Sequence, residues 1–327
     1  MPLEGSEATT NGTVPFSQVW IGDRIIARDV HGDDLVDVLQ QNGDASAWAI
    51  APRTDSAELR RLAKILDLDD LAVAELLDPG HRIGYSEIAG TSLVRLRSPL
   101  AAESLLETES AFDLSMIIAE QVLIMLVDDS HGRDLARVLA GAGPRLTRGG
   151  ADRAAQLAIE ATIARLSTIT ADLEDAGDAL AEALFGGEPL SREKKLEAFR
   201  LRRSVTELRR IIEPTGEVVS ELANSHDDQG PDAVRRWSMI VDHADRAANN
   251  VVMLGESLTA TFDTSLSLDN ARLGELMKRL SGWAAIIAVP TLITSFVGMN
   301  VDFWVQLVLM LVTAAVLFIV FRRKDWV

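Results

Sequence analysis

Hydrophobic and polar residues follow three successive patterns along the chain. In the first 130 residues, short β-type apolar runs recur at residues 19–27, 47–51, 91–97, 111–118 and 121–127. Between them, residues 56–66 and 70–77 have helical spacing, so this part is expected to form a compact α/β domain. After Gly149 the apolar positions take the period of amphipathic helices, which predicts helices at residues 151–184 and 191–222.

The third pattern begins near Pro231, where helical spacing meets no strong break before Pro290. A helix from Asp232 to Met299 would have about 68 residues and a length of ~100 Å. Residues 280–299 and 303–321 contain no charged side chain, and about 20 helical residues cross the ~30 Å hydrocarbon layer of a membrane. Two membrane helices are therefore predicted. The alternative is a pair of buried helices in a soluble core, but core helices seldom run this long without a charged face.

Basic residues flank both predicted spans, with Lys278 and Arg279 before the first and residues 322–324 after the second. Because Lys and Arg stay on the cytoplasmic side, we expect a multi-pass protein of the inner (cytoplasmic) membrane with both termini in the cytoplasm. The start of the chain has no basic segment followed by an apolar run, so no secretory signal is expected.

These patterns divide the chain into eight expected segments. They are a disordered N-terminal tail (1–15), an α/β domain (16–150), antiparallel helices (151–230), a stalk helix (231–279), a first membrane helix (280–299), an external loop (300–302), a second membrane helix (303–321) and a basic C-terminus (322–327).

Charge is distributed unevenly. The formal net charge is −17, and residues 278–327 carry five basic and two acidic groups, which leaves −20 on residues 1–277. An acidic surface repels nucleic acid and concentrates cations, so we expect no nucleic-acid partner; plain solubility is the alternative explanation. The chain has no cysteine, which excludes disulfides and thiolate metal sites, and its five histidines are scattered without the spacing of metal ligands. No phosphate loop, nucleophile elbow or His–carboxylate zinc motif indicates an enzyme.

A polar triplet, Gly298-Met299-Asn300, ends the first predicted span. Alone it could be an ordinary helix C-terminus, because Gly and Asn commonly stop helices. The residues around the triplet strengthen its signal: residues 277–280 (MKRL) lead into the span, Pro290-Thr291 lies within it, and residues 322–326 (RRKDW) close the chain. Upstream, residues 58–90 form a helical segment that leads into a His-Arg pair and a strand. In these features the chain resembles the CorA-type divalent-cation channels over nearly its whole length.

The resemblance implies an α+β cytoplasmic domain of the α/β/α sandwich type, a long stalk helix and two C-terminal transmembrane helices, assembled as a funnel-shaped homopentamer in the lipid bilayer. It implies transport of divalent cations, with Mg²⁺ as the expected substrate and Co²⁺ and Ni²⁺ as further ones, and closure by intracellular Mg²⁺. No covalent cofactor is implied. Gly298, Met299 and Asn300 would form the selectivity filter, a ring of carbonyl and amide oxygens around a hydrated ion.

Two other functions fit the same architecture. A proton-coupled zinc importer of the ZntB type shares the Gly-Met-Asn signature, and the lack of histidine near the pore does not exclude transport of hydrated zinc. In a different class, the two membrane helices could merely tether an enzyme, a sensor or an interaction protein, although a polar signature at the outer face has no purpose in a tether.

Small or hydroxyl-bearing residues recur along one face of the first span, at spacings of three and four. They are Ser281, Ala284, Ala288, Thr291 and Ser295. This face could line a pore for a hydrated ion or form a small-residue helix contact; Thr291 also matches a pore threonine of the family, which favours pore lining. Toward the cytoplasm, Leu280, Met277 and Gly274 continue the face and could narrow the pore, or simply pack as a coiled coil. Asp263 could form an inner ring of carboxylates or be a solvated residue.

Regulation in the family implies carboxylates shared between neighbouring cytoplasmic domains, for which Asp242, Asp245 and Glu87 are candidates. Three features depart from the family pattern: a non-aromatic residue before the signature, a missing stalk asparagine and a shortened outer loop. These are Val297, Gly274 and Val301-Asp302.

Overall fold

The structure is a computed structural model that describes residues 16–30, 32–53, 73–74, 82–88, 90–99, 111–127, 131–143, 146, 150–185, 191–226, 230–297, 303–324 and 326. The chain divides into two compact units. The first comprises Met1–Glu182 and Leu190–Glu256, and the second comprises Ala183–Pro189 and Ser257–Val327.

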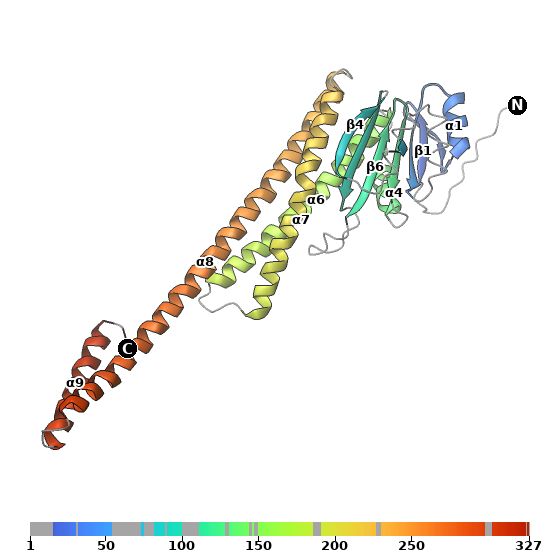
Figure 1. Cartoon of the computed structure of the whole chain (residues 1–327). Coiled ribbons are helices and arrows are strands. Elements are labelled where there is room, and N and C mark those ends of the chain that lie inside the picture. The colour runs from blue at the N-terminus through green and yellow to red at the C-terminus, as the bar shows by residue number, and fades with distance from the viewer. Residues whose placement is uncertain are drawn as a thin grey trace. The chain divides into compact units, whose positions relative to one another are not determined.

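The first unit is built on a mixed sheet of seven strands within the described residues (Figure 1). The strands are β1 (Ser17–Ile21), β2 (Arg24–Arg28), β3 (Ala45–Pro52), β4 (Gly84–Ile88), β5 (Thr91–Ser98), β6 (Phe112–Ile118) and β7 (Val122–Val127), in the spatial order β2-β1-β3-β7-β6-β5-β4. Only the pair β3–β7 is parallel among them. These two central strands are apolar on both faces, as expected for strands covered on both sides.

Helices cover both faces of the sheet. On one face, α1 (Gly32–Gln41) packs against β1 and β3, and its Leu35 and Leu39 belong to a buried core that also contains Ile124; Figure 1 shows α1 beside β1, on the side of the sheet away from α6 and α7. On the other face lie α4 (Gly132–Gly141), α6 (Gly150–Phe185), α7 (Arg192–Ser225) and the start of α8 (Pro231–Val297). Trp48 and Trp237 are fully buried in that second core. The α/β/α sandwich predicted from the sequence is confirmed.

The long helices also agree with the expected pattern. The helices predicted at residues 151–184, 191–222 and 232–299 are α6, α7 and α8, with ends that differ by at most three residues. The second unit contains the outer part of α8 and the apolar helix α9 (Phe303–Arg323), which extends the predicted segment 303–321 by two residues.

Some local predictions were wrong or incomplete. Residues 19–27 are not one strand, because a two-residue turn at Gly22-Asp23 divides them into β1 and β2, and Gly22 has the positive φ of 54° that favours glycine. Helices α1 and α4 had not been expected. β4 is the strand that the family resemblance placed after the His-Arg pair. The helices expected at 56–66 and 70–77 lie outside the described residues, apart from Val73 and Ala74.

Candidate functional site

The C-terminal part of α8, from Leu280 onward, has two opposite faces. Gly282 and Pro290 are buried, and the neighbouring ring of Trp283 lies 6.4 Å from the ring of Phe318 on α9. The residues predicted to line a pore, by contrast, are exposed: Leu280, Ala284, Ala288, Thr291 and Ser295. At about 100° per residue, this exposed stripe lies on the side of the helix opposite to Gly282 and Pro290. The stripe therefore points away from the face that α9 covers.

The hydroxyl groups of Thr291 and Ser295 on this face are oriented by the helix itself. Thr291 Oγ1 donates a hydrogen bond to the carbonyl oxygen of Ile287 at 2.7 Å, and Ser295 Oγ donates to the carbonyl oxygen of Thr291 at 2.9 Å. Each hydroxyl proton is thus used inside the helix, while the oxygen lone pairs remain available as acceptors. Waters around a hydrated cation direct their hydrogens outward, so an acceptor surface of this kind suits such an ion.

The same face continues inward along α8. Met277 and Leu280 are 62% and 64% exposed, and no atom lies within 4 Å of the position that a side-chain carbon on Gly274 would take. Asp263 is exposed as well. Large apolar side chains at this level of exposure, in a row along one helix, are typical of a surface that another chain or a lipid covers.

One helix among the described residues is long and apolar enough to cross a membrane. It is the segment Pro231–Ile293 of α8, whose most apolar window has a mean hydropathy of 1.3 and is 11% buried. Near the C-terminal end of α9, Trp326 stacks on Phe321 at 5.5 Å, and the ammonium of Lys278 on α8 lies 5.8 Å from the Trp326 ring. Aromatic and basic residues of this kind commonly lie at a membrane interface. The second span and the orientation remain predictions.

The signature Gly298-Met299-Asn300 and the loop residues Val301 and Asp302 lie outside the described residues. Their role as an ion filter remains a prediction from the sequence.

The candidate regulatory carboxylates belong to the first unit. Asp242 and Asp245 are exposed on α8, and Glu87 on β4 accepts a hydrogen bond from the Tyr85 hydroxyl at 3.3 Å. Within the part of the chain that the structure describes, no group of three or more His, Cys, Asp or Glu side chains could hold a metal ion. A site that these carboxylates share between neighbouring copies remains a prediction.

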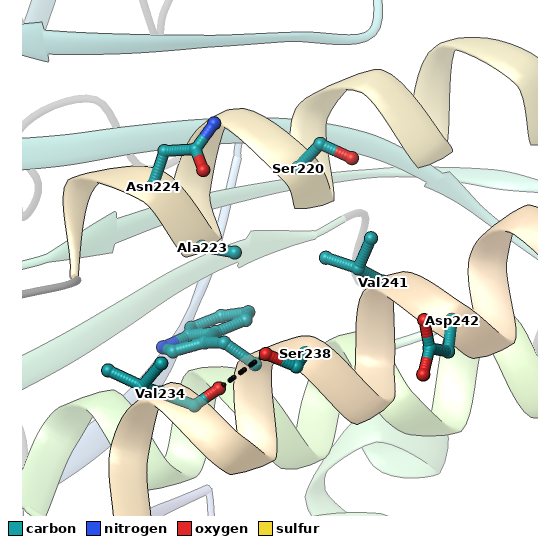
Figure 2. Close-up of a pocket in the computed structure, with 8 residues that line it drawn as sticks. Ser220, Ala223, Asn224, Val234, Ser238, Val241 and Asp242 are labelled. Carbon is teal, nitrogen blue, oxygen red and sulfur yellow. Dashed lines mark hydrogen bonds between the residues drawn. The ribbon is translucent and has the colours of Figure 1, made fainter. Parts of the chain in front are cut away.

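Asp242 lines a cavity of about 260 Å³ between α7 and α8. Figure 2 shows polar side chains from both helices, Ser220 and Asn224 of α7 and Ser238 and Asp242 of α8, with the apolar side chains of Val234 and Val241 among them. The Ser238 hydroxyl donates to the carbonyl oxygen of Val234 at 3.0 Å (Figure 2). A pocket of this size and mixed lining could hold several waters or one small polar molecule.

Sequence reasoning missed a buried polar cluster where α6, α7 and α8 meet. Nε2 of His226 lies 3.2 Å from Oδ1 of Asp152, and the other ring nitrogen lies 2.8 Å from the carbonyl oxygen of Leu222. The fully buried Gln156 donates to Oδ2 of Asp152 at 2.9 Å and accepts from Nε of Arg236 at 3.1 Å. Burial raises the pKa of Asp152, and the positive charges of His226, Arg236 and Arg153 oppose that shift.

Comparison with known families decides the relationship. The family model described as "CorA-like Mg2+ transporter protein" matches residues 43–323. The chain belongs to this family. The triplet Gly298-Met299-Asn300 and the helices α8 and α9 fall within the matched residues.

Two curated CorA proteins share part of this sequence. The cobalt/magnesium transport protein CorA of Methanocaldococcus jannaschii is 35% identical over 82 residues, which cover 22% of this chain and 26% of that protein. The protein of the same name from Thermotoga maritima is 27% identical over 182 residues, covering 51% of this chain and 50% of that protein. The chain thus spans half or less of the length of the curated relatives it matches.

Solved structures share the fold over more of the chain. The complete CorA magnesium transporter from M. jannaschii aligns with a TM-score of 0.74 at 20% identity, covering 95% of this chain and 99% of that one. The full-length CmaX protein aligns with a TM-score of 0.75 at 20% identity, covering 95% and 97%. The cytoplasmic domain of ZntB from Vibrio parahaemolyticus aligns less well, with a TM-score of 0.57 at 11% identity over 69% of this chain and 88% of that one. At these identities the likeness concerns the CorA fold alone.

Proposed function

We propose that this CorA family member is one subunit of a homopentameric channel that carries divalent cations, Mg²⁺ first among them, across the cytoplasmic membrane. The observation that carries the proposal is the stripe of small and hydroxyl-bearing residues on α8, which is exposed and turned away from α9. Five copies arranged around an axis would place five such stripes around one path, with both termini of each chain in the cytoplasm.

Along this path the residues would act in sequence. Gly298, Met299 and Asn300 would form the oxygen-lined outer filter, and Thr291 and Ser295 would accept hydrogen bonds from the waters of the ion. Met277 and Leu280 would form the narrow apolar section that gates the path by dewetting, and Asp263 would attract cations at the inner mouth.

Intracellular Mg²⁺ would act as the regulator as well as the substrate. An ion bound between the acidic cytoplasmic domains in the closed state alone shifts the population toward that state. Support for this part comes from the charge of −20 on residues 1–277 and from the exposed Asp242 and Asp245 on α8.

The test is uptake into proteoliposomes that contain the full chain, with Mg²⁺, Co²⁺, Ni²⁺ or Zn²⁺ outside, with and without a pH gradient. We expect Mg²⁺ flux that does not require the gradient. Flux of Zn²⁺ alone, and only with a proton gradient, would favour the ZntB-type importer instead. If the assembled protein carries none of the four ions, the two membrane helices would merely anchor an enzyme, a sensor or an interaction protein.

A matched pair of variants tests the pore face. Thr291 on α8 and Thr313 on α9 make the same internal hydrogen bond, to the carbonyl oxygens of Ile287 and Leu309 at 2.7 and 2.8 Å. Thr→Val keeps the side-chain shape and removes the oxygen at either place. We expect Thr291→Val to reduce Mg²⁺ flux several-fold and Thr313→Val to leave it near the parent level. Equal effects of the two variants would contradict pore lining by this face of α8.

A further inference from the structure

The first half of α7 carries a charge opposite to that of the molecule. Residues 192–210 contain eight basic and three acidic side chains, a net charge of +5, which leaves −22 on the rest of the chain. All eight basic side chains are exposed. Such a concentration of positive charge on an acidic protein indicates a surface that binds an acidic partner.

Two apolar side chains lie within this basic surface. Ala198, Leu201, Val205 and Leu208 are buried and define the side of α7 that packs within its own unit. On the opposite side, residues recur at spacings of four, three, four and seven: Arg192, Leu196, Phe199, Arg203 and Arg210. Phe199 is 64% exposed and Leu196 is 51% exposed. We call this set the basic face of α7; it combines charge with apolar groups that gain from being covered.

A face of opposite character lies on the preceding helix. Residues 171–182 of α6 contain five acidic side chains and no basic one, a net charge of −5. Leu173, Gly177 and Leu180 are buried, whereas the opposite side presents small and acidic residues that are exposed. These are Ala164, Ala171, Asp175, Asp178 and Glu182, which we call the acidic face of α6.

We propose that the basic face of α7 docks on the acidic face of α6 of the neighbouring copy in the assembly. The proposal rests on the proposed homo-oligomer and names the contact that joins its cytoplasmic parts. Within one chain, each charged face lies opposite the buried side of its own helix, so each face is directed away from the unit that it belongs to. A second copy supplies the matching surface.

Charge and shape both favour this arrangement over a symmetric pair. A contact of α7 with α7 would oppose two surfaces of +5, and a contact of α6 with α6 would oppose two of −5, so neither face can pair with itself. Contact between two different faces of identical chains is heterologous, the type that builds closed rings. The small side chains of Ala164 and Ala171 leave room for Leu196 and Phe199, while acidic groups flank them for the arginines.

The chain has no cysteine, so single cysteines report the contact directly in the full-length protein. Two differently tagged copies are produced together in the membrane, one with Phe199→Cys and the other with Ala171→Cys, and treated with a flexible bismaleimide. We expect a cross-linked dimer that carries both tags. The matched control replaces Phe199→Cys by Glu197→Cys, an exposed position two residues away and off the basic face, and should give several-fold less of the mixed dimer.

Charge reversal makes the test specific. Arg203→Glu in the Phe199→Cys copy should reduce the mixed dimer several-fold, and Asp178→Arg in the Ala171→Cys copy should restore it. A mixed dimer no stronger than the Glu197→Cys control would overturn the proposal. A second result would also overturn the proposal: anionic vesicles protect the cysteine of Phe199→Cys from a water-soluble maleimide, and no mixed dimer forms. The basic face of α7 would then bind lipid head groups. If either of these two results is obtained while Mg²⁺ flux and the pentameric mass are intact, the docking proposal fails but the proposed function stands. If the parent chain itself shows neither Mg²⁺ flux nor the pentameric mass, the proposed function fails.

Discussion

At the scale of single residues, burial perturbs the protonation of the Asp152 carboxyl group. Because the native pKa of Asp152 is raised above the unfolded value of about 3.9, the carboxyl group holds its proton more strongly in the folded state than in the unfolded state. The associated stability is fully present below the unfolded pKa and is lost as the pH rises through the native pKa. Each unit of the shift corresponds to about 1.4 kcal/mol.

We therefore predict that Asp152→Asn becomes more stable relative to the parent as the pH rises through this window, and that the difference stays constant at higher pH. The measurement is thermal unfolding of the full chain in detergent, followed by tryptophan fluorescence across a pH series. Asp44→Asn removes one exposed carboxylate outside the two charged faces and provides the baseline. A difference between Asp152→Asn and the parent that is independent of pH would show that burial does not shift this carboxyl group.

The residue scale also separates what sequence can and cannot predict. The stripe of Ala284, Ala288 and Thr291 followed from spacing, because helical periodicity converts sequence positions directly into one face. The contact of His226 with Asp152 did not follow, since the two residues are far apart in sequence and meet only where three helices pack together. A scattered histidine carries no signal of its own. The filter residues 298–300 and their geometry remain predictions from the family resemblance.

At the scale of elements, α7 begins at a defined cap. Ser191 has an extended backbone, and its side-chain oxygen accepts a hydrogen bond from the backbone N–H of Lys194 at 3.2 Å. We predict that Ser191→Ala destabilises the protein by about 0.5–2 kcal/mol, the usual cost of losing such a cap, whereas Ser191→Asp, which keeps an oxygen acceptor, stays near the parent. Urea unfolding of the full chain in detergent measures both. Equal midpoints for the alanine variant and the parent would mean that the cap is dispensable.

Elements were predictable in proportion to their length. α6, α7 and α8 each sustain an apolar period over more than thirty residues, so the helical pattern was clear along their whole extent. α1 and α4 have ten residues each, and too few turns for a periodic pattern to stand out from their neighbours. The turn at Gly22-Asp23 was missed because β-type residues continue on both sides of it.

At the scale of the whole molecule, sequence indicated a sandwich but not the order of its strands. The parallel pair β3–β7 joins Ala47 to Val122, and three intervening strands of the sheet lie between these partners along the chain. Local patterns contain no information about such distant pairing, since any of the apolar strands could occupy the centre. The solved CorA structures share this fold at 20% identity or less, which indicates that many different side chains satisfy the same arrangement.

The exposed apolar side chains of α8 favour assembly of several copies. One chain presents Met277 and Leu280 more than half exposed on the face of α8 that α9 leaves uncovered, and one such face cannot enclose a path for an ion. Copies arranged around an axis would cover these side chains and enclose the path at the same time. We predict that the full chain in mild detergent has the mass of five subunits of 35.5 kDa after subtraction of bound detergent. Native mass spectrometry measures this mass. The Thr313→Val variant, which changes α9 and not the proposed pore face, serves as the assembly control and should give the same mass. A stable monomer or dimer that still carries Mg²⁺ into proteoliposomes would contradict the pentamer and require the ion path to lie within one or two chains.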